Sequence, residues 1–383
     1  QAAEISTDYC FPNRLEDILM LEKALQYNAA DNKACYYLGC LWYDKRQYAE
    51  AINCWERSVE IEGSLPVVYR NLGIAYFNKT GDQQKALQYF EKAFALDTND
   101  ARILMELDQL YKRLNKPAVE RLQFLESYLD QVLLRDDLYL ERIALYNYIG
   151  KTDKAYDLLM NRHFHPWEGG EGKVSAQYKY CLIQMARKKL NENDFNGAIE
   201  FLQQAQVYPP SLGEGKLIGT QENEIFYWLG RAYEGLKIKE TALAYFEKAT
   251  LGSSEPSAAI FYNDPQPDAI FYQGLGWEKL NYPEKAAAVF NGLVNYGKAH
   301  FNDEIQLDYF AVSLPDLLIF EDDLDKRNKL HCTYIMALGC LGLKSIDEAR
   351  SFFGEVLTID AMHLRAKFHE QLIPLFEYQE IAE

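Results

Sequence analysis

The feature that most limits how this chain can fold is a small residue followed at fixed distances by two apolar ones. Gly39 is followed 12 positions later by Ala51 and 16 positions later by Trp55. A small residue lets two antiparallel helices cross closely, and a large apolar residue fills the space beside the crossing. Stacked helix pairs without β-strands are therefore predicted. The same offsets separate the members of four further sets: Ala186, Ala198 and Leu202; Gly230, Ala242 and Phe246; Gly274, Ala286 and Phe290; and Ala337, Ala349 and Phe353.

The length of the repeat supports this prediction, and one of the repeats is irregular. Leu38-Gly39 recurs 34 positions later as Leu72-Gly73. The second of these glycines, with Ala86 and Phe90, fits the pattern only if one residue is inserted, near Gly81. A step of this size is typical of the tetratricopeptide repeat (TPR), a helix-turn-helix unit. The predicted fold class is all-α: a TPR-type right-handed α-α superhelix, or solenoid, with long loop insertions.

About eight units can be counted, and two of them are irregular because Asp108 and Ile143 stand where the helices should cross. Residues 15–28 are expected to form the second helix of a further unit, and a last helix over about 363–378 is expected to cap the stack. The predicted organisation is N-terminal TPR units over 1–160, a His/Trp/Gly-rich insertion over 161–178, central TPR units over 179–250, a Pro/Asn/Asp-rich loop over 251–268, and C-terminal TPR units with the capping helix over 269–383.

The charge balance argues against polyanionic partners. The chain has 40 Lys and Arg against 57 Asp and Glu, a formal net charge of −17. Nucleic acids and anionic membranes instead attract clustered basic residues. Apolar residues make up 48% of the chain, enough for a packed core, yet no run approaches the ~20 apolar residues of a membrane span. We therefore expect neither a nucleic-acid nor a membrane partner.

The cysteines and the first residue bear on location. Seven cysteines without paired CxxC spacings are expected to be reduced, buried thiols, which favours a cytoplasmic protein. The chain begins at Gln1, so we interpret it as a fragment from which an upstream targeting signal could be missing.

Three long connections, over 161–173, 208–216 and 252–268, contain most of the candidate binding residues. The second repeats the Gly-Glu-Gly-Lys tetrad of the first 43 positions later. Insertions in a solenoid often lie on its binding face, and loops that combine aromatic and charged residues are strong functional candidates. The candidate ligand- or partner-binding residues are His163, His165, Trp167, Glu168, Glu171, Lys173, Glu214, Lys216, Tyr262, Asp264, Asp268 and Tyr309.

None of these segments matches a known catalytic or cofactor motif. A phosphate-binding P-loop needs Ser or Thr after its Lys, but Lys173 is followed by Val174 and Lys216 by Leu217. The tetrads could instead form turns, bind an anion or carboxylate, or contact another domain. His163 and His165 lack well-placed third and fourth metal ligands. We therefore expect no metal, no cofactor and no catalysis by this chain alone.

Four loop motifs together resemble one family. Residues 164–174, 212–217, 262–264 and 308–316 are similar to the C-terminal TPR region of large bacterial proteins. The N-terminal half of that family is a β-rich domain of unknown function that looks related to carbohydrate-active β-sandwich proteins. The resemblance covers the whole chain. It implies that this chain is the TPR half and that any chemistry would involve the other half, and it carries over no catalytic residue.

Two functional hypotheses follow. In the first, the chain is a non-catalytic scaffold that docks on its own N-terminal domain, on a second protomer or on a peptide. In the alternative, the loops form a pocket for a small ligand, a saccharide, and help complete a carbohydrate-active site with the N-terminal domain. The alternative requires one set of side chains to meet in one cleft: Trp167, Glu171, Lys173, Lys216, Asp264 and Tyr309.

Overall fold

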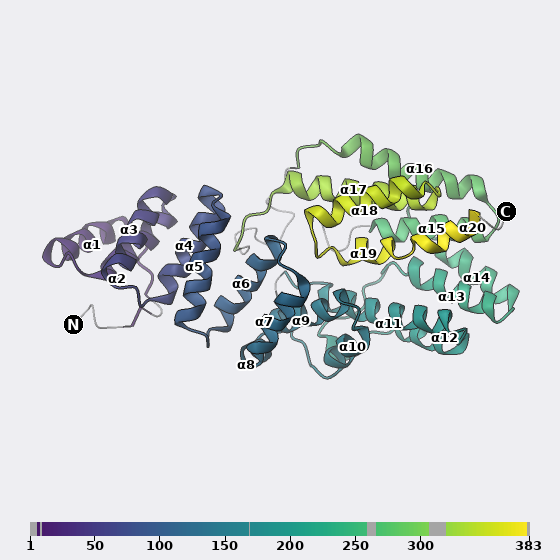
Figure 1. The fold of residues 1–383 in the computed structure, drawn as a ribbon, viewed down its shortest axis with the longest axis horizontal. Helices are drawn as coiled ribbons and strands as arrows, with labels where there is room; N and C mark the ends of the chain where they lie inside the picture. Colours follow the sequence, from purple (N-terminus) through teal and green to yellow (C-terminus); the bar gives the residue numbers. More distant parts are fainter. Residues whose placement is uncertain (1–5, 8–9, 168, 259–265, 306–318, 381–383) are drawn as a thin grey trace. The chain divides into compact units, whose positions relative to one another are not determined.

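The computed structural model describes residues 6–7, 10–167, 169–258, 266–305 and 319–380 (Figure 1). All regular secondary structure in these ranges is helical, and no strand occurs in them. Within the same residues, no helix combines the length and the apolar character that crossing a lipid bilayer requires. The predicted all-α, TPR-type solenoid is confirmed.

The chain divides into two compact units, which are described separately. Unit 1 consists of the described residues within Gln1–Lys116, Glu126–Arg135 and Asp316–Glu321, and unit 2 of those within Pro117–Leu125, Asp136–Pro315 and Asp322–Glu383. The helices of unit 1 are α1 (Leu15–Tyr27), α2 (Asn32–Asp44), α3 (Tyr48–Ile61), α4 (Pro66–Ala75), α5 (Gln83–Leu96), α6 (Ala101–Arg113) and α8 (Leu129–Leu133). Helix α7 (Ala118–Ser127) begins in unit 2 and ends in unit 1.

Unit 2 continues the pattern of helix pairs. In each pair the first helix packs against the second, and the first helices of successive pairs also contact one another. The helices of unit 2 are, in chain order, α9 (Asp136–Tyr148), α10 (Thr152–Met160), α11 (Lys173–Asn191), α12 (Phe195–Gln204), α13 (Asn223–Gly235), α14 (Lys239–Ala249), α15 (Pro267–Lys279), α16 (Pro283–His300), α17 (Leu324–Gly342), α18 (Ile346–Ile359), α19 (Leu364–Glu370) and α20 (Ile373–Glu380).

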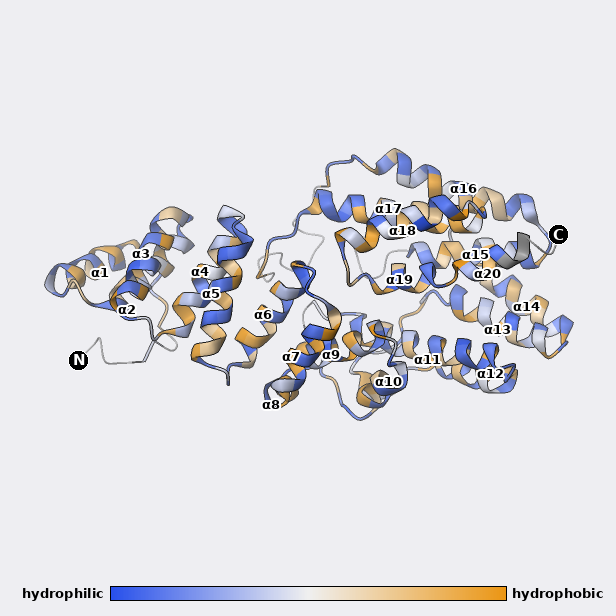
Figure 2. Cartoon of the chain, viewed as in Figure 1, coloured by the Kyte–Doolittle hydropathy of each residue, from blue (hydrophilic) through white to orange (hydrophobic). Residues whose placement is uncertain are grey.

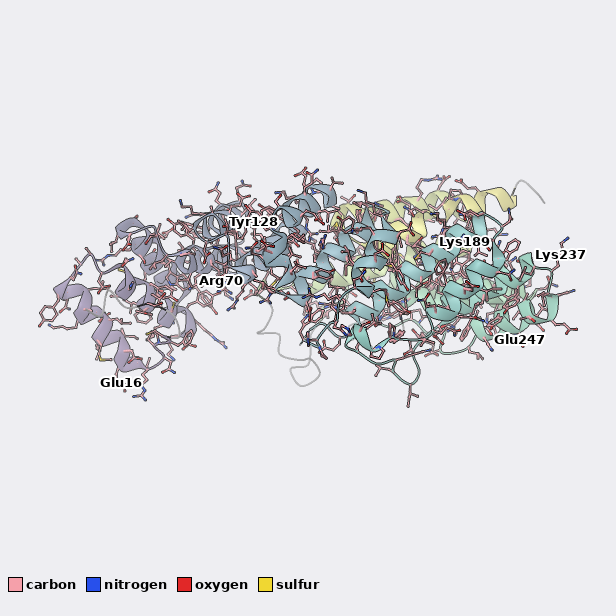
Figure 3. All side chains as sticks on the ribbon, turned by 90° about the horizontal axis from the view of Figure 1, so that it is seen from below. Glu16, Arg70, Tyr128, Lys189, Lys237 and Glu247 are labelled. Carbon is pink, nitrogen blue, oxygen red and sulfur yellow. The ribbon has the colours of Figure 1, made fainter. Side chains whose placement is uncertain are left out.

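The small residues lie where two helices of a pair cross. A Cβ atom added to Gly39 would lie 2.5 Å from the ring of Trp55, and one added to Gly230 would lie 2.5 Å from the ring of Phe246. Both rings are almost fully buried. Hydrophobic and hydrophilic residues alternate around the turns of the helices (Figure 2), as expected for helices with one packed face. Charged residues such as Lys237 and Glu247 are exposed on the α13–α14 pair (Figure 3).

The residue inserted in the second repeat produces a π-helical turn. Residues Tyr76–Thr80 continue α4 as a π-helix, and the amide of Gly81 donates to the carbonyl of Tyr76 five positions earlier. A π turn accommodates one more residue than an α turn and is often found at functional sites. Gly81 then ends the turn with a left-handed φ of 73°, which glycine adopts without steric cost. The irregularity noticed near Gly81 in the sequence therefore has a specific structural cause.

The N-terminal end of the repeat array follows the prediction, and the C-terminal end departs from it. Helix α1 forms where the second helix of a further unit was predicted. The single C-terminal helix expected over 363–378 is instead two helices, α19 and α20. Pro374 explains the break, because proline has no amide hydrogen to donate to the carbonyl four residues earlier, at Glu370.

Candidate functional site

Glu214, in the second Gly-Glu-Gly-Lys tetrad, caps a helix that begins in the first. One of its carboxylate oxygens accepts a hydrogen bond from the amide of Gly172 (2.8 Å) and the other from the amide of Ser175 (2.6 Å). These amides lie at the N-terminus of α11, where no intrahelical acceptor is available. A carboxylate there satisfies the free amides and interacts favourably with the helix dipole. For Glu214, the structure therefore shows a turn-and-cap role.

The first two connections also meet at other points. The amide of Phe164 donates to the carbonyl of Ser211 (2.9 Å), and the ring of Phe164 is buried. Lys216 forms an ion pair with Glu222 (2.6 Å) and donates to the carbonyl of Gln206 (3.1 Å). The loops are therefore fixed by contacts with the chain itself.

Other predicted residues in the first connection are near the surface. The ring of half-buried Trp167 lies against the backbone of Gly170, where an added Cβ would be 2.3 Å away. Glu171, Lys173 and His163 are exposed. Glu168 lies outside the described residues, as do Tyr262, Asp264 and Tyr309. The cleft that the saccharide hypothesis requires therefore stays a prediction.

Asp136 holds the end of the first connection. It accepts from the backbone amide of His165 (2.8 Å), lies 3.2 Å from Nδ1 of the same residue, and pairs with Arg162 (2.5 Å). Burial acts to raise the pKa of Asp136, but these partners outweigh it and the pKa is lowered. Among the described residues, no group of three or more His, Cys, Asp or Glu side chains is placed to hold a metal ion.

Asp268 belongs to a buried polar cluster rather than to a loop site. It forms an ion pair with Arg365 and accepts from the hydroxyl of Tyr334 (2.5 Å), and Arg365 also pairs with Glu224 (2.7 Å). Burial acts to raise the pKa of Asp268, but Arg365 and Tyr334 outweigh it and the pKa is lowered to about 2. The cluster joins α13, α15 and α17 to α19.

Helix α19 lies across the first helices of unit 2, which we call the inner face of unit 2 (α9, α11, α13, α15 and α17) (Figure 1). Phe368 is buried against Tyr180 and under the guanidinium of Arg187, both on α11. Lys367 donates to the last carbonyl of α9, at Tyr148 (2.8 Å). His369 is fully buried against Phe271 on α15, and this burial lowers its pKa to about 3. The inner face of unit 2 is therefore occupied by a segment of the chain itself.

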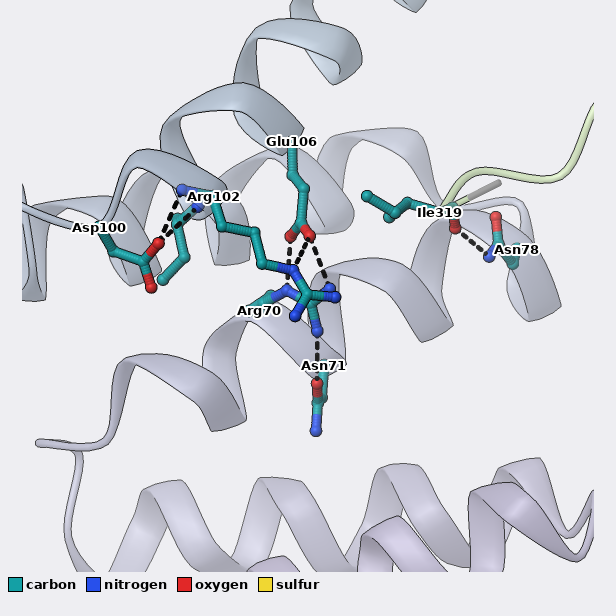
Figure 4. Close-up of polar contacts among 8 residues, drawn as sticks. Arg70, Asn71, Asn78, Asp100, Arg102, Glu106 and Ile319 are labelled. Carbon is teal, nitrogen blue, oxygen red and sulfur yellow. Dashed lines mark hydrogen bonds and ion pairs between the residues drawn. The ribbon is translucent and has the colours of Figure 1, made fainter. Parts of the chain in front are cut away.

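The inner face of unit 1, formed by α2, α4 and α6, is bridged by a buried ion pair. Arg70 on α4 forms two hydrogen bonds with the fully buried carboxylate of Glu106 on α6, one of them 2.6 Å long (Figure 4). Arg102 adds a third contact with the same carboxylate (3.0 Å). A guanidinium that forms two parallel bonds fixes the geometry of its partner. Helices α4 and α6 are therefore held at a defined spacing next to the π turn.

Where this face ends, at the π turn after α4 and the last residue of α6, unit 1 holds residues 319–321. The side chain of Asn78 donates to the carbonyl of Ile319 (2.8 Å; Figure 4). It also accepts from the amide of Glu321 (2.9 Å). Arg113 donates to the carbonyls of Phe320 (3.2 Å) and Glu321 (3.4 Å). Four backbone groups of a three-residue segment are therefore bound by side chains of α6 and the π turn.

Phe320 occupies an aromatic pocket between the π turn and α5, at the end of this face. Its ring is 1% exposed and lies edge-on to Phe77, with ring centroids 4.9 Å apart, and 5.5 Å from Phe90. The guanidinium of Arg113 lies 5.8 Å from the ring centre of Phe320. We call this site, formed by Phe77, Asn78, Lys79, Phe90 and Arg113, the Asn78 groove.

This site was not predicted from the sequence. Asp323, the N-cap of α17, is exposed, whereas Phe320, three residues earlier, is buried. One signal was available, because the inserted residue near Gly81 marks the turn that carries Asn78. Nothing in the spacing of the repeats indicated which segment Asn78 would bind.

Three stretches of the chain match family models described as tetratricopeptide repeat: residues 32–64, 68–100 and 224–251. The fold resembles that of YrrB, whose structure is titled as a TPR protein with an unusual peptide-binding site (15% identity, 60% of this chain and 90% of that chain, TM-score 0.33). It also resembles a TPR protein from Parabacteroides merdae ATCC 43184 (14% identity, 68% and 91%, TM-score 0.39) and a structure of Naa15/Naa10 bound to HypK-THB (12% identity, 95% and 59%, TM-score 0.41). The helix pairs themselves, rather than these distant similarities, establish the fold.

Proposed function

We propose that this protein is a non-catalytic scaffold that binds polypeptide segments on the inner faces of its helical units. The observation that carries the proposal is the pair of hydrogen bonds between the side chain of Asn78 and the backbone of Ile319 and Glu321. A side-chain amide that both donates to and accepts from one backbone recognises polypeptide as such, because every residue except proline offers the same two groups.

The match to tetratricopeptide models supports the proposal, since residues 68–100 include the π turn and Asn78. Stacked repeats create extended surfaces that suit elongated partners. The partner we propose is a domain of the parent protein, a second copy of the chain or a separate peptide. The exposed His163, Glu171 and Lys173 stay predicted partner contacts. The described loop residues do not favour saccharide binding as a second function, because Glu214, Lys216 and Asp268 bond to the chain itself.

The test is a selection of random 12-residue peptides on the full chain. In a Phe320→Ala variant, residues 319–321 should bind the groove less tightly. A Phe320→Ala/Asn78→Ala variant also lacks the two hydrogen bonds of Asn78. We expect the single variant to enrich peptides that the double variant fails to bind, with matching circular dichroism spectra for both. If the two variants enrich the same peptides, or neither enriches any, the proposed scaffold function at this face is wrong.

A further inference from the structure

The Asn78 groove holds a segment that is remote in sequence and is not part of a repeat. Asn78 and Ile319 are 241 positions apart. Residues 319–321 have no regular secondary structure and lie between α16 and α17 along the chain. The segment therefore meets the groove as a ligand would, through its backbone and one buried side chain.

The backbone contacts require a non-helical segment. The amide of Glu321 and the carbonyls of Ile319, Phe320 and Glu321 all bond to side chains of unit 1. In the interior of an α-helix these groups would be bonded within the helix and could not be bound in this way. The contacts are independent of sequence, so they supply affinity without choosing a partner.

The aromatic pocket selects the side chain at the middle residue of the segment. Phe320 is almost completely buried between Phe77 and Phe90, with the guanidinium of Arg113 near its ring. An aromatic ring is favoured there, because it buries a large apolar area, packs edge-on against other rings and attracts a cation to its face. A small aliphatic side chain would leave the pocket partly empty.

The residue that follows Phe320 lies next to a cationic side chain. Lys79 forms an ion pair with Glu321 and lies 4.5 Å from the ring centre of Tyr48. Burial acts to lower the pKa of Lys79, but the pairing outweighs it and the pKa is raised. The side chain of Glu321 is 58% exposed, so the pair contributes modestly to affinity. It nonetheless favours an acidic residue over a basic one.

We infer that the Asn78 groove is a recognition site for non-helical peptide segments with an aromatic residue followed directly by an acidic one, and that residues 319–321 are its internal competitor. This inference rests on the proposed function and names the class of partner. A partner segment binds when it displaces residues 319–321 from Asn78, Arg113 and the aromatic pocket. The π turn formed by the inserted residue is what places Phe77, Asn78 and Lys79 together.

The internal segment should weaken external binding by a predictable factor. A tethered ligand acts at an effective concentration of about 1 mM. If residues 319–321 have an intrinsic Kd of about 10 μM for the groove, this competition weakens the apparent affinity of an external peptide about 100-fold. Removing the internal side chain should restore most of that factor.

The test is fluorescence anisotropy with a labelled peptide of the sequence of residues 316–324 and the full chain. We expect the peptide to bind the Phe320→Ala variant about 100-fold more tightly than the unaltered chain. Adding Asn78→Ala should abolish the gain. Adding Asn71→Ala should keep it, because Asn71 is a half-buried asparagine on α4 that contacts Cys40 and Arg70 instead of the segment. If Phe320→Ala changes the circular dichroism spectrum, Phe320→Leu provides a milder release, with a smaller gain of the same sign.

Two altered peptides test the selectivity. Alanine in place of the phenylalanine should weaken binding to the released chain more than tenfold, and lysine in place of the following glutamate about fivefold. Equal binding of all three peptides would overturn the inference. If the peptide selection described above yields Asn78-dependent peptides without the aromatic-acidic pair, the proposed function stands and this selectivity is wrong. If no peptide depends on Asn78 in either experiment, both are wrong.

Discussion

Glu171 and Glu214 occupy the same position in two identical tetrads, yet only one has the surroundings of a structural residue. Glu214 accepts two backbone hydrogen bonds at the start of α11, whereas Glu171 is exposed. The repeated sequence alone gives both residues the same interpretation. Their difference comes from where the chain places each carboxylate relative to a helix terminus.

At this scale we predict that Glu214→Ala lowers the free energy of unfolding by about 1–2 kcal/mol, the usual effect of losing a helix cap. The matched change Glu171→Ala should alter it by less than about 0.5 kcal/mol, as at other exposed positions. Urea unfolding followed by circular dichroism measures both. Equal losses in the two variants would show that the cap on α11 is not what stabilises this region.

At the scale of the element, the chain is organised by the closeness of its paired helices. The offsets in the sequence placed the crossings correctly, because a small residue and the ring that covers it lie on consecutive helices of one pair. Local sequence also accounts for the break between α19 and α20, which lies just before Pro374. What local sequence did not indicate is that α19 would lie across the inner face of unit 2.

The crossing of α13 and α14 provides the second prediction. Gly230→Ala places a Cβ 2.5 Å from the buried ring of Phe246, so the helices must separate, and we expect a loss of about 1–3 kcal/mol. The control is Gly354→Ala in α18, where an added Cβ meets nothing within 4 Å and alanine is the better helix former. Thermal unfolding should show a lower midpoint for the first variant and an equal or higher one for the second. A Gly230→Ala chain as stable as the unaltered chain would contradict the close-crossing argument.

At the scale of the whole molecule, stability should depend on pH through the histidines buried in unit 2. Burial lowers the pKa of His369 to about 3 and also lowers the pKa of His331 and of His363. Nδ1 of His369 lies 2.8 Å from the carbonyl of Arg365, and the hydroxyl of Tyr334 donates to Asp268. The hydrogen is therefore assigned to Nδ1 of a neutral ring.

The sign follows from proton binding. An unfolded histidine takes up a proton near pH 6.5, but folded His369 does not until about pH 3. Between these values the unfolded state binds more protons, so the free energy of unfolding falls as the pH falls, by up to about 1.4 kcal/mol per pH unit for one such histidine. Asp268 adds a further loss only below about pH 4, as the pH falls toward its lowered pKa.

We therefore predict that the chain is about 1–2 kcal/mol less stable at pH 5 than at pH 7 because of His369. His369→Gln should remove much of this difference, since glutamine does not titrate, while the same change at exposed His163 should leave it in place. Urea unfolding at the two pH values measures the effect. An unchanged difference in His369→Gln would show that other groups control the acid sensitivity.

By itself, the sequence determined the helix pairs, their crossing residues, the irregular second repeat and the all-α class, because each depends on residues close together along the chain. Only the tertiary structure decided what occupies the inner faces: residues 319–321 on unit 1 and α19 on unit 2. Those contacts join positions more than 200 residues apart, through connections that follow no repeat. The surface pattern of a repeat specifies that a face can bind polypeptide, but which segment reaches it depends on the path of the whole chain.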